Sequence, residues 1–278
     1  MTDLELRVQG IGLRRKMLQL IFDAGAGHTG GGLSCIDILN VLYHRVLNVS
    51  PENPGDRNRD RYVQSKGHCV EALYTVLAQR GFFPDAHLKT VCHYRSHYVG
   101  HPTRHVPGVE MNTGALGHGL PICVGMALAG KMDQAPFRVF ALLGDGELAE
   151  GSNWEAGLAA AHYGLDNLVA ILDHNTLQIT GHTYDVMSTE PIADKWRAFG
   201  WHVLSIDGHD YAQLTDALTR VPETGKPTFV VANTIKGKGV SFMENVAKWH
   251  HGVPKQDELD RALSELTELE TSLKEGRA

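Results

Sequence analysis

The segments RVFALLGDGELAEG (138–151) and NLVAILDHN (167–175) decide the fold of this chain. Each opens with a continuous apolar run and ends in polar residues, which is typical of a strand buried on both faces of a parallel sheet. Between them, NWEAGLAAAHYG (153–164) is rich in small residues and predicts a helix. A strand, a helix and a second strand in this order predict a parallel sheet with right-handed crossovers.

The alternation continues on both sides of these strands. Downstream, WHVLSIDG (201–208) and PTFVVANTI (227–235) predict a third and a fourth buried strand, and YAQLTDALTRV (211–221) predicts the helix between them. Upstream, the patterns predict a helix at 4–25 ending in Gly25, a loop at 27–32, a helix with Ser34 as its N-cap, a short strand and turn at 59–68, and a helix to about Gln79. The expected fold is α/β, with a doubly wound parallel sheet flanked by helices.

The 278 residues contain no internal repeat and no linker that would divide them, so we expect one domain over 1–278. The last segment, DELDRALSELTELETSLKEG (257–276), predicts a charged amphipathic helix at a surface or an interface.

Charge and hydropathy exclude several classes of partner. The net charge of −6 argues against nucleic acid or an anionic membrane as the main partner. We expect no membrane span, because no run of about 18 apolar residues occurs, and no secretory signal, because MTDLELRVQG has no apolar core. The four cysteines lie far apart without a CxxC pair, which favours a reduced, cytoplasmic location.

Polar residues follow two of the predicted strands directly. Asp145 lies between Gly144 and Gly146 at the end of the first, and Asn175 ends the second. Ligands gather at the carboxyl ends of parallel strands, and oxygen ligands suit a hard divalent cation. One carboxylate and one amide are too few alone, so a diphosphate would supply further oxygens, and the two glycines would let the backbone approach it. The alternative is that Asp145 is a turn residue and Asn175 caps a helix.

The sixteen histidines cluster at 93–105 and at 250–251. A lone histidine is usually an exposed loop residue, but several beside glycine-rich turns favour proton transfer and phosphate contact near neutral pH.

The Gly-Asp-Gly motif followed thirty residues later by Asn175 resembles the thiamine-diphosphate motif, and residues 10–255 resemble the N-terminal half of transketolases. The motifs that carry this resemblance are GAGHTGGGLS (25–34), RYVQSKGH (61–68), VGHP (99–102), GVEMNTGALGHGLPICVGMALA (108–129) and KGKGVSF (236–242).

The resemblance implies specific roles for matched residues. Asp145, Asn175 and the main-chain oxygen of Leu177 would bind Mg²⁺ or Ca²⁺. The implied cofactor-binding residues are His68, Gly114, Ala115, Leu116, Gly144, Asp145, Gly146, Glu150, Asn175, Lys236, His250 and His251, with Glu150 joining the active sites of two subunits. The implied catalytic residues are His28, His68, His101 and His251.

The chain departs from the family pattern at three places. The segment before Gly100 is shorter than usual, and Ala115 and His118 stand where the family often has Pro and Gln. The late histidine of the family falls on WHHG: counting from Lys236 selects His250, whereas the following Gly-x-Pro selects His251, which is slightly preferred.

The function implied by the resemblance is transfer of a two-carbon ketol unit from a ketose to an aldose, with thiamine diphosphate as the electron sink. In the family, the carboxylate that activates the pyrimidine ring belongs to a second domain, and we expect no such domain within these 278 residues. We therefore expect a transketolase N-terminal subunit that is active only with a separate pyrimidine-binding C-terminal subunit, in an α2β2 heterotetramer. Pentose phosphates, branched sugars and sulfonated sugars all remain possible substrates.

Other classes of protein stay open. The chain could be the α subunit of a 2-oxoacid dehydrogenase, half of a 1-deoxyxylulose-phosphate synthase-like enzyme, or a non-catalytic regulatory subunit that keeps the cofactor site. A fragment of a longer protein would have the same sequence.

Overall fold

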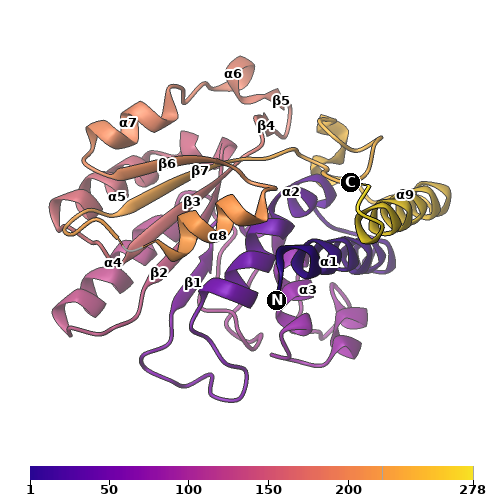
Figure 1. Ribbon diagram of the computed structural model, residues 1–278, viewed down its shortest axis with the longest axis horizontal. Helices are drawn as coiled ribbons and strands as arrows, with labels where there is room; N and C mark the ends of the chain where they lie inside the picture. The colour runs from indigo at the N-terminus through magenta and orange to yellow at the C-terminus, as the bar shows by residue number, and fades with distance from the viewer. Residues whose placement is uncertain (221, 278) are drawn as a thin grey trace.

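A five-stranded parallel sheet forms the centre of the computed structural model, which describes residues 1–220 and 222–277 (Figure 1). The strand order is β1-β2-β3-β7-β6, and every neighbouring pair is parallel. The strands are β1 (Arg61–Gln64), β2 (Val139–Gly144), β3 (Leu168–His174), β6 (His202–Asp207) and β7 (Thr228–Asn233). The α/β fold predicted from the sequence is therefore confirmed.

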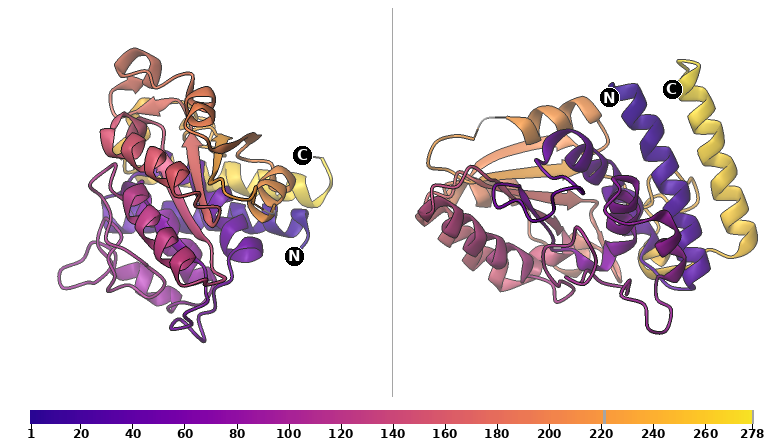
Figure 2. Two further views of the ribbon diagram at one scale, coloured as in Figure 1. Left: turned by 90° about the vertical axis from the view of Figure 1, so that its left-hand side faces the viewer. Right: turned by 90° about the horizontal axis from the view of Figure 1, so that it is seen from below.

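Helices cover both faces of the sheet, because alternate strand residues point to opposite sides (Figures 1 and 2). In β2, for example, Phe140 and Leu142 belong to one hydrophobic core and Ala141 and Leu143 to the other. The first core is closed by α1 (Asp3–Ala24), α2 (Thr29–Val41), α3 (Val70–Gln79), α8 (Tyr211–Thr219) and α9 (Gln256–Lys274). The second is closed by α4 (Gly119–Met132), α5 (Gly151–His162) and α7 (Ile192–Ala198).

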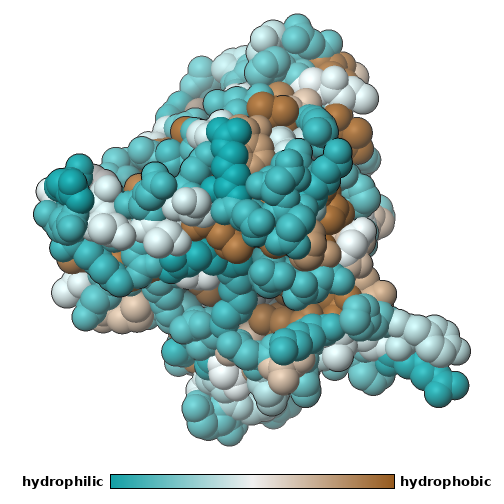
Figure 3. Space-filling model, turned by 90° about the vertical axis from the view of Figure 1, so that its right-hand side faces the viewer, coloured by the Kyte–Doolittle hydropathy of each residue, from teal (hydrophilic) through white to brown (hydrophobic). Residues whose placement is uncertain are grey.

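The first and last helices lie side by side, with both termini at the same end (Figure 2). Thr2 and Glu5 form a capping box at the start of α1, and Gly25 ends that helix in the left-handed conformation, with φ 63°. The charged α9 buries Leu259, Leu266 and other apolar residues of one face. From the side of α9 the surface is mainly hydrophilic, with hydrophobic side chains in smaller patches (Figure 3).

Shorter elements complete the chain. β4 (Leu177–Gln178) and β5 (Gly181–His182) form an antiparallel pair, followed by α6 (Thr183–Val186). A π-helical turn covers Leu42–Val46, and 3₁₀ turns cover Gly67–Cys69, Asp85–Thr90, Gly146–Ala149 and Ala247–His251.

The predicted loop at 27–32 is too long and the predicted N-cap at Ser34 is wrong, because only Gly27 and His28 of that loop lie outside a helix and α2 already begins at Thr29. Ser34 is buried inside this helix, where its hydroxyl donates to Gly31 O and Asp173 Oδ2 at 2.9 and 2.6 Å. The helix contains glycines at positions 30–32 because neighbouring residues leave no room for a side chain there. A Cβ atom on Gly31 would lie 2.7 Å from the Cys69 sulfur. Close tertiary packing here overrides the low helix propensity of glycine.

Two further predictions need adjustment. The strand at 201–208 is predicted to be buried, but β6 lies at the edge of the sheet and is largely half-exposed. The helix predicted at 211–221 is α8, and its last predicted residue, Val221, lies outside the described residues. None of the helices in residues 1–220 and 222–277 is long and apolar enough to cross a membrane.

Candidate functional site

The predicted metal ligands lie at the carboxyl ends of β2 and β3, which pair directly with Gly144 opposite Asp173. The carboxylate of Asp145 accepts hydrogen bonds from the backbone N–H groups of Gly146, at 2.8 Å, and of Thr176. The second bond fastens the end of β2 to the residue that follows Asn175. Asp145 and Asn175 are each only 3% exposed, so both predicted ligand side chains are buried.

Burial raises the pKa of Asp145 to about 6, with a further contribution from the negative charge of Asp173. A cation beside this carboxylate would stabilise its ionised form. The described part of the chain contains no group of three His, Cys, Asp or Glu side chains placed to hold a metal ion. A cation here would therefore need oxygens from Asn175, from the backbone and from a ligand.

A buried ion pair lies next to the predicted metal-ligand residues. The Lys66 ammonium contacts the carboxylate of Asp173, and both side chains are almost completely buried. Lys66 also donates to Gly31 O at 3.2 Å, and Asp173 accepts from Ser34 and Thr234. The pair thus joins β1, the start of α2, β3 and the segment after β7 directly beneath the site.

Glu147 holds the glycine-rich turn at 114–117 against the end of β2. Its carboxylate accepts from the backbone N–H groups of Gly117 and Gly144, both at 3.0 Å, and from the Ser65 hydroxyl. Burial raises the pKa of Glu147. At the other end of the turn, Gly114 has φ 141°, and a Cβ atom on it would lie 2.7 Å from the His101 ring. Only glycine fits this close approach.

Five histidines from four separate segments gather above the strand ends. The ring of His28 lies 5.2 Å from that of His68, 6.3 Å from His101, 5.6 Å from His250 and 4.6 Å from His251, measured between ring centroids. His68 and His250 stack at 5.4 Å. The structure thus brings together the histidines of the four motifs, whereas His97 and His105 pair with each other outside this cluster.

Two members of the cluster, His28 and His250, are held as neutral imidazoles. Burial lowers the pKa of His28 to about 4, and the neighbouring His68, His251 and His101 lower it further. Burial, followed by the charge of Lys236, lowers the pKa of His250 to about 3. Neutral imidazoles can both accept and donate protons, which suits exchange of protons with sugar hydroxyl groups.

The structure separates the roles of the two adjacent late histidines. His250 lines the cavity, and its Nδ1 lies 2.8 Å from the Lys236 ammonium, which also donates to Leu177 O at 3.2 Å. His251 is exposed and lies farther out, in contact with His28. Both alignments of the sequence thus select a residue of the cluster, but only His250 faces the strand ends.

Most of the predicted site residues line one cavity. They are His28, His68, Gly114, Leu116, Gly144, Asp145, Gly146, Asn175, Leu177, Lys236 and His250. Four others lie outside its lining, namely His101, Ala115, Glu150 and His251. His101 and His251 still touch the histidine cluster, whereas Ala115 and Glu150 are exposed.

Sequence reasoning missed five residues of the cavity wall: Gly31, Lys66, Glu147, Gln178 and Ile179. Asp173, the partner of Lys66, had a usable signal, because it ends an apolar run predicted to be buried. A charge in such a position requires an opposite charge nearby. Gln178 and Ile179 follow the predicted Asn175, but nothing in their spacing shows which of them points into the cavity.

The fold and the site define a class of protein. A parallel sheet presents an aspartate and an asparagine at neighbouring strand ends, below a cavity lined by buried lysines, glycines and histidines. This is an α/β protein with a ligand cavity at the carboxyl ends of its parallel strands.

Comparison with known proteins agrees with this description of the fold and the site. The family model described as "Transketolase, thiamine diphosphate binding domain" matches residues 12–268. The chain is 47% identical over 264 residues to an apulose-4-phosphate transketolase subunit from Phocaeicola vulgatus, covering 95% of this chain and 94% of the relative. It is 42% identical to the 6-deoxy-6-sulfo-D-fructose transketolase subunit SqwG of a Clostridium species, covering 95% and 97% respectively.

Solved structures extend the likeness to single-chain transketolases. The Campylobacter jejuni transketolase superimposes with a TM-score of 0.85 at 30% identity, over 99% of this chain and 48% of that one. The Leishmania mexicana transketolase gives 0.84 at 27% identity, over 100% and 46%. The chain thus spans about half the length of these solved chains. It belongs to the transketolase family, as a subunit of the thiamine-diphosphate-binding type, and neither the other classes of enzyme nor a purely regulatory role is favoured.

Proposed function

We propose that this chain holds thiamine diphosphate and Mg²⁺ at the ends of β2 and β3 and performs ketol transfer only with a separate pyrimidine-binding subunit. The observation that carries the proposal is the convergence of Asp145, Asn175 and the Leu177 carbonyl, beneath a cluster of histidines, in one cavity. The whole described chain would act as a single diphosphate-binding domain.

The residues present fit a metal–diphosphate unit. Asp145 supplies one carboxylate with a raised pKa, and Asn175 and Leu177 supply neutral oxygens. Three protein oxygens leave room in an octahedron for diphosphate oxygens and water, as Mg²⁺ prefers. The same set would accept Ca²⁺ at longer distances.

Donors for the diphosphate line the same cavity. The buried Lys236 ammonium faces it, and the buried Nε2 of Gln178 has no hydrogen-bond partner among the described residues. We propose His68 and the backbone N–H of Gly146 as further contacts, since both residues line the cavity. The Gly146 N–H donates to Asp145 in this structure, so it would exchange that partner for a diphosphate oxygen. A buried cation and an unpaired donor favour a multiply charged anion even in a chain with net charge −6.

When bound, thiamine diphosphate supplies the electron sink that lets a two-carbon ketol unit leave one sugar and join another. The chain contributes binding, orientation and proton transfer. His28, His68 and His101 would contact sugar hydroxyl groups, with His250 or His251 at the far side of the cluster. Since His28 stays neutral above about pH 4, it can accept a hydroxyl proton and return it.

A partner subunit would complete the site. Ile179 lines the cavity yet is 71% exposed, and Tyr184 and Met187 nearby in sequence are 63% and 61% exposed. Apolar side chains exposed beside a binding cavity favour burial by another protein. Glu150 is also exposed, next to Gly117, where it could reach a carboxylate of another subunit. We propose an α2β2 heterotetramer; a cytoplasmic location remains a prediction from the separate cysteines.

The substrates proposed are sugars or sugar phosphates. The relatives named above act, by their names, on apulose 4-phosphate and on 6-deoxy-6-sulfo-D-fructose. A branched sugar phosphate or a sulfonated sugar is therefore tested alongside the pentose phosphates.

The test is reconstitution. The chain is purified alone and with a co-expressed C-terminal-type transketolase subunit, and ketol transfer is assayed with each donor in the presence of thiamine diphosphate and Mg²⁺. We expect turnover only with both subunits and both cofactors. Robust turnover by the chain alone would contradict the two-subunit proposal. A complex whose thermal stability does not rise with cofactor and metal would favour a regulatory role instead.

A further inference from the structure

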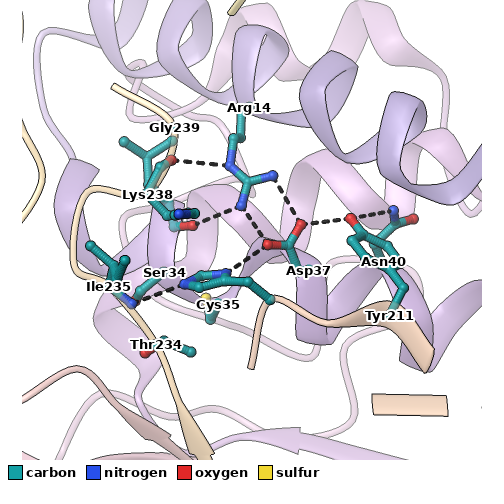
Figure 4. Close-up of polar contacts among 12 residues, drawn as sticks. Arg14, Ser34, Cys35, Asp37, Asn40, Tyr211, Thr234, Ile235, Lys238 and Gly239 are labelled. Carbon is teal, nitrogen blue, oxygen red and sulfur yellow. Dashed lines mark hydrogen bonds and ion pairs between the residues drawn. The ribbon is translucent and has the colours of Figure 1, made fainter. Parts of the chain in front are cut away.

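A buried polar network centred on Asp37 joins four parts of the chain (Figure 4). Asp37 lies on α2 and is 3% exposed. The Arg14 guanidinium of α1 donates to both carboxylate oxygens, at 2.9 and 2.6 Å, and the Tyr211 hydroxyl of α8 donates to one of them at 2.6 Å. Burial alone would raise the pKa of Asp37, but Arg14 and His209 hold it well below its usual range.

His209 bridges this network to the segment after β7. Its Nε2 lies 2.9 Å from the backbone nitrogen of Ile235, and its Nδ1 lies 2.8 Å from Asp37 Oδ2. A backbone N–H can only donate, so Nε2 must be the acceptor. The proton of the ring is therefore on Nδ1, which donates to Asp37, and His209 bridges the two as a neutral imidazole.

The network forms hydrogen bonds with the backbone on both sides of Lys236. His209 holds Ile235, the residue before it, and the Arg14 Nε donates to the carbonyl of Lys238, two residues after it, at 3.1 Å. Between these contacts, the Gly237 N–H donates to Gly30 O at 3.0 Å. A lysine side chain is flexible, so the direction of its ammonium depends on how firmly its backbone is fixed.

We propose that His209 and Asp37 are positioning residues for Lys236: through the backbone of residues 235–238, they aim its ammonium into the cofactor cavity. This inference rests on the proposed function, because Lys236 is assigned there to the diphosphate. His209 itself lines no part of that cavity, so it acts only through Lys236.

His209 is the right residue to change. Removing Arg14 or Asp37 would leave an unpaired buried charge and could unfold the chain. His209→Phe keeps a ring but removes both hydrogen bonds. His209→Gln keeps an acceptor and a donor on its terminal amide group and should restore the bridge. Tyr211→Phe is the matched control, because it removes a bond to Asp37 that does not lead to residues 235–238.

The measurement is calorimetric affinity for thiamine diphosphate and for inorganic pyrophosphate, each with Mg²⁺, on the complex with the partner subunit. We expect His209→Phe to weaken both about tenfold, the size of one charge-assisted hydrogen bond, and His209→Gln and Tyr211→Phe to stay within about twofold of wild type. In a Lys236→Met background, His209→Phe should add no further loss, because its effect passes through the lysine.

Additive losses in the double variant, or an unchanged affinity in His209→Phe, would overturn the inference. Crystal structures of the cofactor-free complexes give a second readout, in which the Lys236 ammonium should leave Leu177 O and His250 in His209→Phe but not in Tyr211→Phe. An unmoved Lys236 also overturns it. If Lys236 moves and affinity falls as expected but no sugar is turned over, the proposed function fails while the positioning role stands.

Discussion

The Nζ atom of Lys236 lies 2.8 Å from Nδ1 of His250. An ammonium group can only donate, so Nδ1 is the acceptor and the proton of the neutral ring is on Nε2. The lysine thereby fixes both the tautomer and the charge of a histidine that stacks on His68. Any change that removes the ammonium should be visible at His250.

Lys236→Met tests this coupling directly. Burial and then the positive charge of Lys236 lower the pKa of His250 to about 3. Without that charge, protonation of the imidazole costs less, so we expect the pKa of His250 to rise by about one unit. NMR titration of the histidine side chains measures it, and Lys248→Met, which removes an exposed lysine close in sequence, is the control. An equal pKa in Lys236→Met and wild type would show that burial alone sets the value.

Glu71→Gln tests a buried carboxyl beside the site. Glu71 is 1% exposed, its Oε2 has no hydrogen-bond partner within the described residues, and burial raises its pKa from 4.5 to about 8. Between these pH values the unfolded chain releases the proton while the folded chain keeps it, so the stability of the folded state falls as the pH rises. The amide variant escapes this penalty.

We therefore expect the unfolding free energy of Glu71→Gln at pH 8 to exceed that of wild type by about 4 kcal/mol, since one pKa unit corresponds to about 1.36 kcal/mol. Near pH 4 the difference should vanish. Urea unfolding at the two pH values measures it, and a gain that does not depend on pH would point to packing rather than ionisation.

The sequence placed Asp145 and Asn175 at neighbouring strand ends but missed the buried charges that support them. Asp145 and Asn175 could be placed together because β2 and β3 are uninterrupted apolar runs, and such runs pair in a buried parallel sheet. The Lys66–Asp173 pair was missed because local patterns do not report which buried charges meet across strands. The start of α2 was misplaced because local helix propensity argues against glycine. The glycines there are instead required by close contacts with residues that are distant in the sequence.

The histidine cluster also depends on tertiary structure that the local sequence does not predict. The resemblance to transketolases selected His28, His68 and His101 from their motifs, but the choice between His250 and His251 depends on the turn at Ala247–His251. That turn directs one ring toward Lys236 and the other outward, which counting along the sequence cannot determine.

Gly31→Ala tests whether the glycines of α2 are required by packing. Its Cβ atom would lie 2.7 Å from the buried Cys69 sulfur, so we expect a loss of about 1–3 kcal/mol in unfolding free energy. Gly125→Ala is the matched control, because Gly125 lies exposed within α4 and a Cβ atom there meets nothing within 4 Å. That variant should gain about 0.5–1 kcal/mol from helix propensity. Chemical denaturation measures both, and a gain in Gly31→Ala would mean that the residues around Cys69 yield easily.

Asp145→Asn separates the stability of the chain from its cofactor affinity. The buried carboxylate is unfavourable without a cation, as its raised pKa shows, so replacing it with a neutral amide should not lower the unfolding free energy of the cofactor-free chain near pH 7. The affinity for thiamine diphosphate with Mg²⁺ should instead fall at least about tenfold, because the only carboxylate among the three proposed ligands is lost.

Calorimetry at fixed Mg²⁺, repeated with EDTA, measures this effect for wild type, Asp145→Asn and the exposed control Asp185→Asn. Chelation should lower the affinity of wild type and of Asp185→Asn for thiamine diphosphate to that of Asp145→Asn. It should change the affinity of Asp145→Asn little. If EDTA weakened all three proteins equally, the metal would be bound without Asp145, and the ends of β2 and β3 would hold the diphosphate alone.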